Sequence, residues 1–194
     1  MDPPLPGRSH RRQRGGAAQP GPLGPHRRGT PDVHPPEQRE ADIAAGSRLP
    51  AAELRAWLTS TAQELAADFD TLPDQAWDAK IITAQGLSRP AREIPWMRVR
   101  EVYIHAIDLG AGTRWTGLPD DFLAALLDDV AGRRSAQGGG PALAAAATDT
   151  GHTWEVTGTG APVPVSAPLA DLAAYLTGRP APELKAAPVL PPWL

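Results

Sequence analysis

The sequence predicts an α+β fold in which helices come first and a small mixed α/β region follows. Amphipathic stretches with apolar residues at helical spacing dominate residues 50–137, and short β-type segments separated by turns lie between residues 143 and 166. Helical and mixed segments that are separated in this way usually form their own cores, so we expect two domains with a boundary near residues 112–118. A chain of 194 residues is long enough for one or two small domains.

Each predicted helix has its own start and stop signals. The first begins at Pro50, where a proline is tolerated in the first turn, and carries an apolar stripe as far as Leu72. The second covers residues 95–109 and is followed by two glycines. The third starts at Asp120 with acidic residues early and arginines late, as the helix dipole favours. A last, short helix is expected over residues 169–176.

The remaining segments predict less regular structure. Residues 35–49 are expected to form a polar connection with a short helical turn, and residues 81–93 an irregular extended segment. After a glycine-rich linker, strands are expected at residues 143–148, 152–157 and 163–166.

The first 34 residues differ in composition from the rest of the chain. They contain six arginines and two acidic residues, no aromatic residue, scattered prolines and glycines, and no apolar periodicity. Such a segment buries too little apolar surface to offset its ordering entropy, which predicts disorder. Arginine-rich arms can also bind nucleic acid or acidic membranes. A further hypothesis is that GC-rich coding DNA is read here in the wrong frame, which produces Arg, Pro, Gly and Ala in these proportions.

Composition excludes several classes of protein. The chain has no cysteine, so disulfides, thiolate metal sites and a protein thiol nucleophile are ruled out, and any thiol must come from a bound small molecule. The net charge of −3 gives no basic footprint for nucleic acid. Apolar runs stay well below the roughly 18 residues that cross a membrane, and the start does not resemble a signal peptide. We therefore expect a cytoplasmic protein with neither nucleic acid nor membrane as partner.

The predicted helix at residues 96–109 carries the candidate chemistry. At about 100° per residue, Arg98, Glu101, His105 and Asp108 share one narrow face, while most other positions are apolar. We expect this helix to be enclosed by core, so that its buried carboxylate and imidazole need a cation to offset their desolvation. Glu101 and His105, one turn apart, would be metal ligands, and Asp108 would orient the imidazole. A solvated stripe with weak surface pairs is the alternative, and spacing alone leaves both open.

A longer pattern resembles a known family. The run TAQG…EIPWMRVREVYIHAIDLGAG…LPDDFLAALLDDV…ATDTGHTWEV…LADLAAYLTGR…LPPWL is similar to the mycothiol-dependent maleylpyruvate isomerases over residues 35–194. Its most specific parts are residues 94–112 and 118–130. The resemblance implies a DinB-like helical bundle with a zinc site, followed by a small α/β C-terminal domain. Residues 35–114 would then be an incomplete bundle, and residues 117–194 the α/β domain.

The resemblance also implies roles for individual residues. Glu101 and His105 match two of the family's three metal ligands, which form an E-x-x-x-H pattern on one helix. Arg179, in Leu-Thr-Gly-Arg, matches an arginine that the C-terminal domain supplies to the active site, although a structural role at a helix end is the alternative.

The third metal ligand has no counterpart. The family places this histidine in a segment of the type His-Leu-Ala-Arg-Asn, which this chain lacks. His10, His26 and His34 lie among Pro, Gly and Arg residues with no rigid element to aim them, and His152 is expected to face solvent. We therefore expect an impaired metal site.

The implied reaction uses a divalent metal, expected to be zinc, together with mycothiol. In the family, zinc polarises the thiol, which adds to the double bond of maleylpyruvate; rotation and loss of the thiol give the trans isomer. The expected partner is therefore a small-molecule electrophile such as maleylpyruvate, and an arginine suits its carboxylates. Three readings remain open: an enzyme whose N-terminal residues are misread, an inactive remnant, or a non-enzymatic binding module. The true substrate and the oligomeric state are left open.

Overall fold

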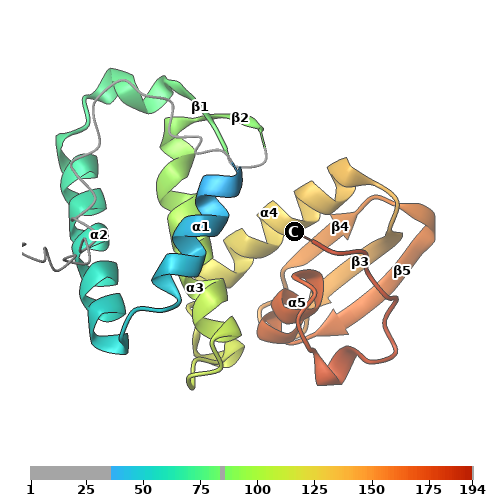
Figure 1. Ribbon diagram of the computed structural model, residues 1–194. Coiled ribbons are helices and arrows are strands. Elements are labelled where there is room, and N and C mark those ends of the chain that lie inside the picture. Colours follow the sequence, from blue (N-terminus) through green and yellow to red (C-terminus); the bar gives the residue numbers. More distant parts are fainter. Residues whose placement is uncertain (1–35, 84–85, 194) are drawn as a thin grey trace, which may run out of the picture. The chain divides into compact units, whose positions relative to one another are not determined.

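The computed structural model describes residues 36–83 and 86–193 (Figure 1). The described residues form five α-helices and two small sheets, which confirms the predicted α+β class. By contact density the chain divides into two compact units, residues 1–63 and 64–194. None of the described helices combines the length and apolar character that a membrane-spanning helix requires.

Helix α1, Pro36–Gly46, is longer than the short turn expected for this segment. Its sequence explains the difference: a proline opens the helix, and good helix formers such as Glu, Gln, Arg and Ala follow. The Gln38 amide donates to Asp42 at 2.8 Å, one turn on. A Cβ at Gly46 would lie 3.2 Å from the ring of Trp57, so glycine at the helix end allows this close approach.

Helix α2, Ala51–Thr71, confirms the predicted helix after Pro50, and the boundary between the two units falls within it. None of its residues is buried, so its predicted apolar stripe is not part of a core. Beyond α2, a short 3₁₀ turn at Asp74–Asp78 precedes strands β1, Lys80–Ile82, and β2, Ser88–Pro90. These strands pair antiparallel where only irregular extended chain was expected.

Helices α3, Ile94–Asp108, and α4, Asp120–Gln137, lie close to their predicted bounds. A proline in its first turn opens α3, and Gly110, with φ of 64°, follows its end. Aromatic rings hold the two helices together: the ring centroid of Phe122 lies 4.5 Å from that of Tyr103 and 5.8 Å from that of Trp96.

A three-stranded sheet follows, built from β3 (Pro141–Ala147), β4 (Thr153–Val156) and β5 (Thr159–Ala167). The strand order is β4-β3-β5, with β4 antiparallel and β5 parallel to β3. Burial alternates along the strands, so one face is covered and the other is open to solvent. Register brings inward side chains into rows; Ala145, for example, lies between Trp154 and Val165, and all three are buried.

Helix α5, Leu169–Leu176, matches its predicted bounds and packs with α4 over the covered face of this sheet (Figure 1). The largest fully buried side chains of the core come from α4, α5 and β3. They are Leu123, Leu126, Leu127, Val130, Leu143, Leu169, Leu172 and Leu176. Burying one such leucine contributes about 1.5–3 kcal/mol. This core fixes α4 and α5 rigidly, and α5 carries the arginine of the candidate site at its end.

The segment after α5 packs back onto the helices. The Tyr175 hydroxyl donates to the Pro188 carbonyl at 2.6 Å, and the Arg134 Nη1 donates to the Pro191 carbonyl at 3.0 Å. The Arg134 Nε also donates to the Leu176 carbonyl at 2.8 Å. These hydrogen bonds hold the segment that leads to Trp193, whose side chain is buried with 3% exposure.

Candidate functional site

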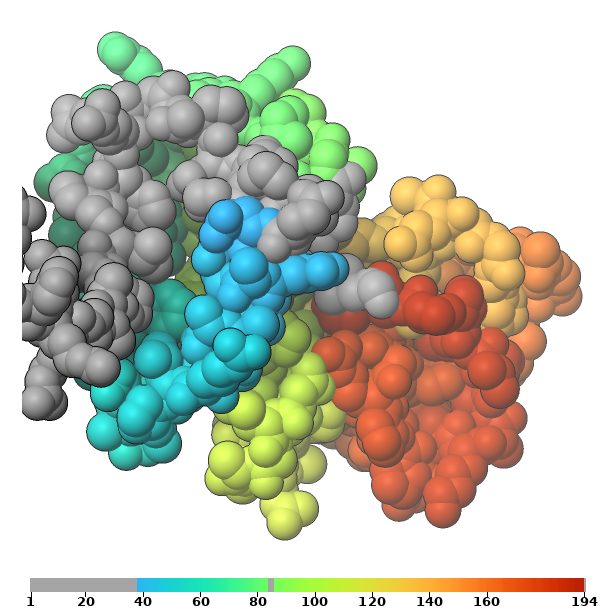
Figure 2. Space-filling view, viewed as in Figure 1, coloured from blue at the N-terminus to red at the C-terminus, as the bar shows by residue number. Residues whose placement is uncertain are grey.

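The polar face of α3 is more exposed than the sequence predicted. The side chain of His105 is 62% exposed and that of Glu101 is 43% exposed. Only Arg100 and Ile104 are buried on this helix, while Val99 and Val102 are 41% and 48% exposed, and Leu109, directly after the helix, is 78% exposed. Figure 2 shows part of this yellow-green segment at the surface. The expectation of a helix enclosed by core is therefore wrong, because α3 packs along one side only. With the two groups largely hydrated, desolvation does not by itself demand a cation.

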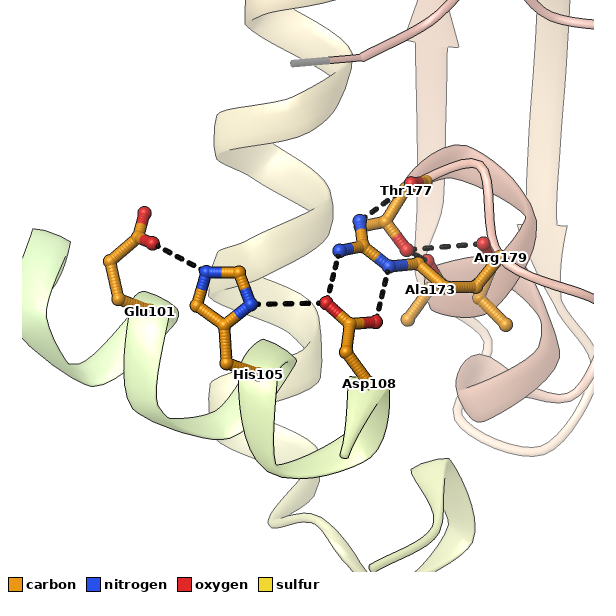
Figure 3. Close-up of polar contacts among 7 residues, drawn as sticks. Glu101, His105, Asp108, Ala173, Thr177 and Arg179 are labelled. Atoms are coloured by element: carbon orange, nitrogen blue, oxygen red, sulfur yellow. Dashed lines mark hydrogen bonds and ion pairs between the residues drawn. The ribbon is translucent and has the colours of Figure 1, made fainter. Parts of the chain in front are cut away.

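The predicted residues nonetheless lie in contact with one another (Figure 3). The Nε2 of His105 lies 3.1 Å from Oε2 of Glu101, and its Nδ1 lies 3.1 Å from Oδ2 of Asp108. Spacings of three and four residues on one helix produce this alignment. Both ring nitrogens therefore face carboxylate oxygens.

Asp108 also connects α3 to the end of α5. The Nε of Arg179 donates to Oδ1 of Asp108 at 3.1 Å, and its Nη2 donates to Oδ2 at 2.8 Å. This bidentate pairing holds the pKa of the Asp108 carboxyl below its usual value, against a smaller opposing effect of burial and with help from His105. Asp108 thus lies between a histidine and an arginine.

The backbone at the end of α5 sets the position of Arg179. The amide of Gly178 donates to the Tyr175 carbonyl at 2.9 Å, and the amide of Arg179 donates to the Ala174 carbonyl at 2.8 Å. This pair of bonds is a Schellman motif, which requires a left-handed residue after the helix, and Gly178 has φ of 75°. Arg179 also contacts the end of the helix, since its Nη1 donates to the Thr177 carbonyl at 2.8 Å.

A second group of charges, which sequence reasoning missed, lies beside this line. The buried guanidinium of Arg100 donates to Oδ2 of Asp129 at 2.7 Å, and Arg133 donates to Oδ1 of the same carboxylate at 2.7 Å. Burial raises the pKa of Asp129, but the hydrogen bonds from Arg133 and Arg100 outweigh it, so this pKa is lowered overall. The signal in the sequence was Arg100 itself, a lone arginine on the apolar side of α3.

An open groove with a volume of about 520 Å³ adjoins Asp108 and Arg179. Its lining also includes Arg114, Trp115 and Asp171. Across residues 36–83 and 86–193, no hydrogen bond or ion pair engages the side chain of Arg114. The groove is therefore lined by two guanidinium groups: that of Arg114, which is unpaired among the described residues, and that of Arg179, which is paired with Asp108.

The described residues fit a metal only in part. Within the described part of the chain, no group of three or more His, Cys, Asp or Glu side chains is arranged to hold an ion. Glu101 and His105 converge closely enough to share a cation, but Asp108 is taken by Arg179, and a catalytic zinc site needs three protein ligands. His10, His26 and His34 lie outside the described residues, and His152 is exposed, as expected.

The pair of Asp108 on α3 and Arg179 after α5 joins two segments of the chain, and a separate family model matches each of them. The model of the mycothiol maleylpyruvate isomerase N-terminal domain matches residues 8–110, and the model of the C-terminal domain of the same family matches residues 118–190. The first match begins further toward the N-terminus than the resemblance noted from residue 35. The chain belongs to the mycothiol maleylpyruvate isomerase family.

Solved structures agree with this assignment. A crystal structure of a mycothiol-dependent maleylpyruvate isomerase aligns with a TM-score of 0.74 and 31% identity, covering 82% of this chain and 68% of that one. A histidine-to-alanine mutant of such an enzyme aligns with a TM-score of 0.70 and 33% identity, covering 76% of this chain and 61% of that one. No curated protein sequence matches the chain significantly.

Proposed function

We propose that the chain is a mycothiol-dependent cis–trans isomerase of the maleylpyruvate type, or a related thiol transferase, with activity reduced by an incomplete metal site. The observation that carries this proposal is the unbroken line of contacts from Glu101 through His105 and Asp108 to Arg179. Family membership supports the use of mycothiol, and the absence of cysteine agrees with a nucleophile brought by a small molecule.

Mycothiol would supply a thiolate, which adds to the activated double bond, permits rotation about the resulting single bond, and then leaves. The chain's own contribution is to orient His105. Asp108 lies against Nδ1 of the ring and Glu101 against Nε2, so the imidazole is held in one orientation on α3. Arg179 fixes the Asp108 carboxylate, so that it faces the ring rather than rotating into solvent.

Arg179 is poorly suited to bind the substrate directly. Three of its nitrogens already donate, two to Asp108 and one to the Thr177 carbonyl. Arg114 lines the same groove with an unpaired guanidinium, and it is the group we assign to the carboxylate of a dicarboxylate substrate. Arg179 then acts by holding Asp108.

Glu101 and His105 are also the two donors that we assign to a divalent cation, with zinc the expected metal. Two protein ligands bind zinc more weakly than three, so we expect less than one zinc per chain after dialysis. When bound, the cation would favour the thiolate form of mycothiol, so an incompletely occupied site lowers the activity.

The experiment measures thiol-dependent isomerisation of maleylpyruvate and bound zinc on the same purified chain. Mycothiol-dependent turnover that falls about 100-fold in His105→Asn, but not in His152→Asn, supports the proposal. His152 is a matched control because it is an exposed histidine away from the site. Stoichiometric zinc would contradict the impaired-site part of the proposal.

An inactive remnant or a non-enzymatic binding module is the second candidate. The exposure of His105 favours it, because catalytic groups usually work in sites from which water is excluded. If the folded chain shows no mycothiol-dependent turnover and no affinity for mycothiol by calorimetry, the enzymatic proposal fails and this candidate takes its place.

A further inference from the structure

Trp193 lies against two arginines from different parts of the chain. The guanidinium carbons of Arg100 on α3 and of Arg179 after α5 each lie 5.7 Å from the centroid of its ring. Both distances are within the range of a cation–π contact. The ring is 3% exposed, so these contacts are made away from water, where they are strongest.

Each of these arginines is neutralised by its own aspartate. Arg100 pairs with Asp129 at 2.7 Å, and Arg179 pairs with Asp108 at 2.8 Å. The indole therefore contacts two ion pairs rather than two bare cations, so unpaired like charges are not held together at its ring. Contacts therefore run without a break from Asp129 on α4, through Arg100 and Trp193, to Arg179 and its partner Asp108.

We propose that Trp193 is a positioning residue for Arg179, which holds the guanidinium in the orientation that presents its fork to Asp108. The catalytic consequence rests on the proposed function, whereas the structural part of the proposal does not. A flexible arginine side chain has many rotamers, and the bidentate pair needs one of them. The ring removes water from one side of Arg179, which lowers the local dielectric and strengthens the pair with Asp108.

Two observations distinguish positioning from simple core filling. The indole nitrogen of Trp193 is buried and has no hydrogen-bond partner among the described residues, so an apolar side chain would fill this space without leaving a polar group unpaired. The segment is also anchored independently, by Arg134 at Pro191 and by Tyr175 at Pro188. What tryptophan adds here is a π face for two guanidinium groups.

The test follows the Arg179 side chain directly by NMR, through its Nε–H signal in the ¹⁵N-labelled full-length chain. The variants are Trp193→Leu, which removes the π face, and Trp193→Phe, which keeps a smaller one. Tyr175→Phe is the matched control, because it loosens the same segment without touching Arg179. In the parent chain we expect an Arg179 Nε–H signal displaced by the ring current and slow to exchange with water.

In Trp193→Leu we expect that displacement to disappear and exchange to accelerate about tenfold, the equivalent of one desolvated cation–π contact. Trp193→Phe should restore part of both effects. Tyr175→Phe should lower the melting temperature and leave the signal in place. The proposal is overturned if Trp193→Leu merely lowers the melting temperature, as the control does, with Arg179 unchanged. If Trp193→Leu does not fold, an undisplaced signal in the parent chain or in Trp193→Phe overturns it equally.

Kinetics supply a second, separate readout. If the chain has thiol-dependent isomerase activity, Trp193→Leu should lower kcat about tenfold with little change in KM, because Arg179 orients Asp108 and does not bind substrate. An equal effect on KM alone would contradict the positioning role. If the parent chain has no activity, the proposed function fails, while the NMR result still decides the role of Trp193.

Discussion

Both carboxylate oxygens of Asp108 accept hydrogen bonds from Arg179, a residue 71 positions later in the chain, at 3.1 and 2.8 Å. One of these oxygens also lies 3.1 Å from Nδ1 of His105. Since the same carboxylate contacts both the arginine and the imidazole, a change at Arg179 reaches His105 without direct contact between the two.

Arg179→Lys tests this relationship. A lysine keeps the positive charge but cannot form the bidentate fork, so Asp108 gains freedom and its pKa should move up toward the ordinary aspartate value. NMR titration of the Asp108 carboxyl carbon measures the shift. Arg133→Lys is the control, because Arg133 pairs with Asp129 and should leave Asp108 as it is. An unchanged Asp108 titration in Arg179→Lys would show that the fork is not what holds the carboxylate.

Acid stability should depend on Asp129. Its folded-state pKa lies below the ordinary value, so its contribution to stability is complete above about pH 3.9 and is lost as the pH falls through the lower folded-state value. Asp129→Asn should therefore lower the melting temperature at pH 6 and flatten its fall between about pH 4 and pH 2. Thermal unfolding at a series of pH values measures both. A fall as steep as that of the parent chain would contradict the assignment.

Arg114→Ala should weaken substrate binding. Loss of one charged hydrogen-bond donor for a carboxylate is expected to raise KM for maleylpyruvate about tenfold and to leave kcat within a factor of about two. Lys185→Ala is the matched control, since Lys185 is an exposed cation that does not line the groove. If both substitutions raise KM equally, the effect is one of overall charge and the groove is not the binding site.

Gly158→Ala should destabilise the C-terminal sheet. An added Cβ would lie 2.4 Å from the Gly140 carbonyl oxygen, which forces the linker before β3 and the turn before β5 apart. We expect a loss of about 1–3 kcal/mol in the free energy of unfolding. Gly132→Ala, on an exposed part of α4 with open space around it, should instead stabilise the helix by about 0.5–1 kcal/mol. Urea denaturation of the two variants compares them, and a neutral Gly158→Ala would contradict the close approach.

Local sequence signals were enough to predict the helices that carry the site. Pro95 and the glycines at 110 and 112 bracket α3, and Asp120 and Leu169 begin α4 and α5 close to where the structure has them. The shared face of Glu101, His105 and Asp108 also followed from helical spacing, because their contacts are local to one helix. Contacts between residues three or four positions apart on one helix can be predicted from the sequence, because helical geometry alone fixes them.

The features that depend on long-range packing could not be predicted in this way. The exposure of His105 depends on which sides of α3 have neighbours, and helical periodicity alone does not contain that information. The pairing of Arg100 with Asp129, and the contacts of Trp193, join residues brought together only by the packing of α4 and α5. The polarity of the segment before residue 50 predicts mostly irregular connection, but the helix propensity of its Glu, Gln, Arg and Ala residues prevails and forms α1.

Gly178, in the turn at the end of α5, sets the position of site residues that it does not contact. With φ of 75°, Gly178 holds a backbone conformation that any side chain would disfavour, and Arg179 leaves the turn in the direction this conformation sets. A missense change in the codon for Gly178 would therefore disconnect His105 from its arginine support while every polar residue of the site remained in the sequence. The site therefore depends on the absence of a side chain at Gly178 as well as on its polar residues.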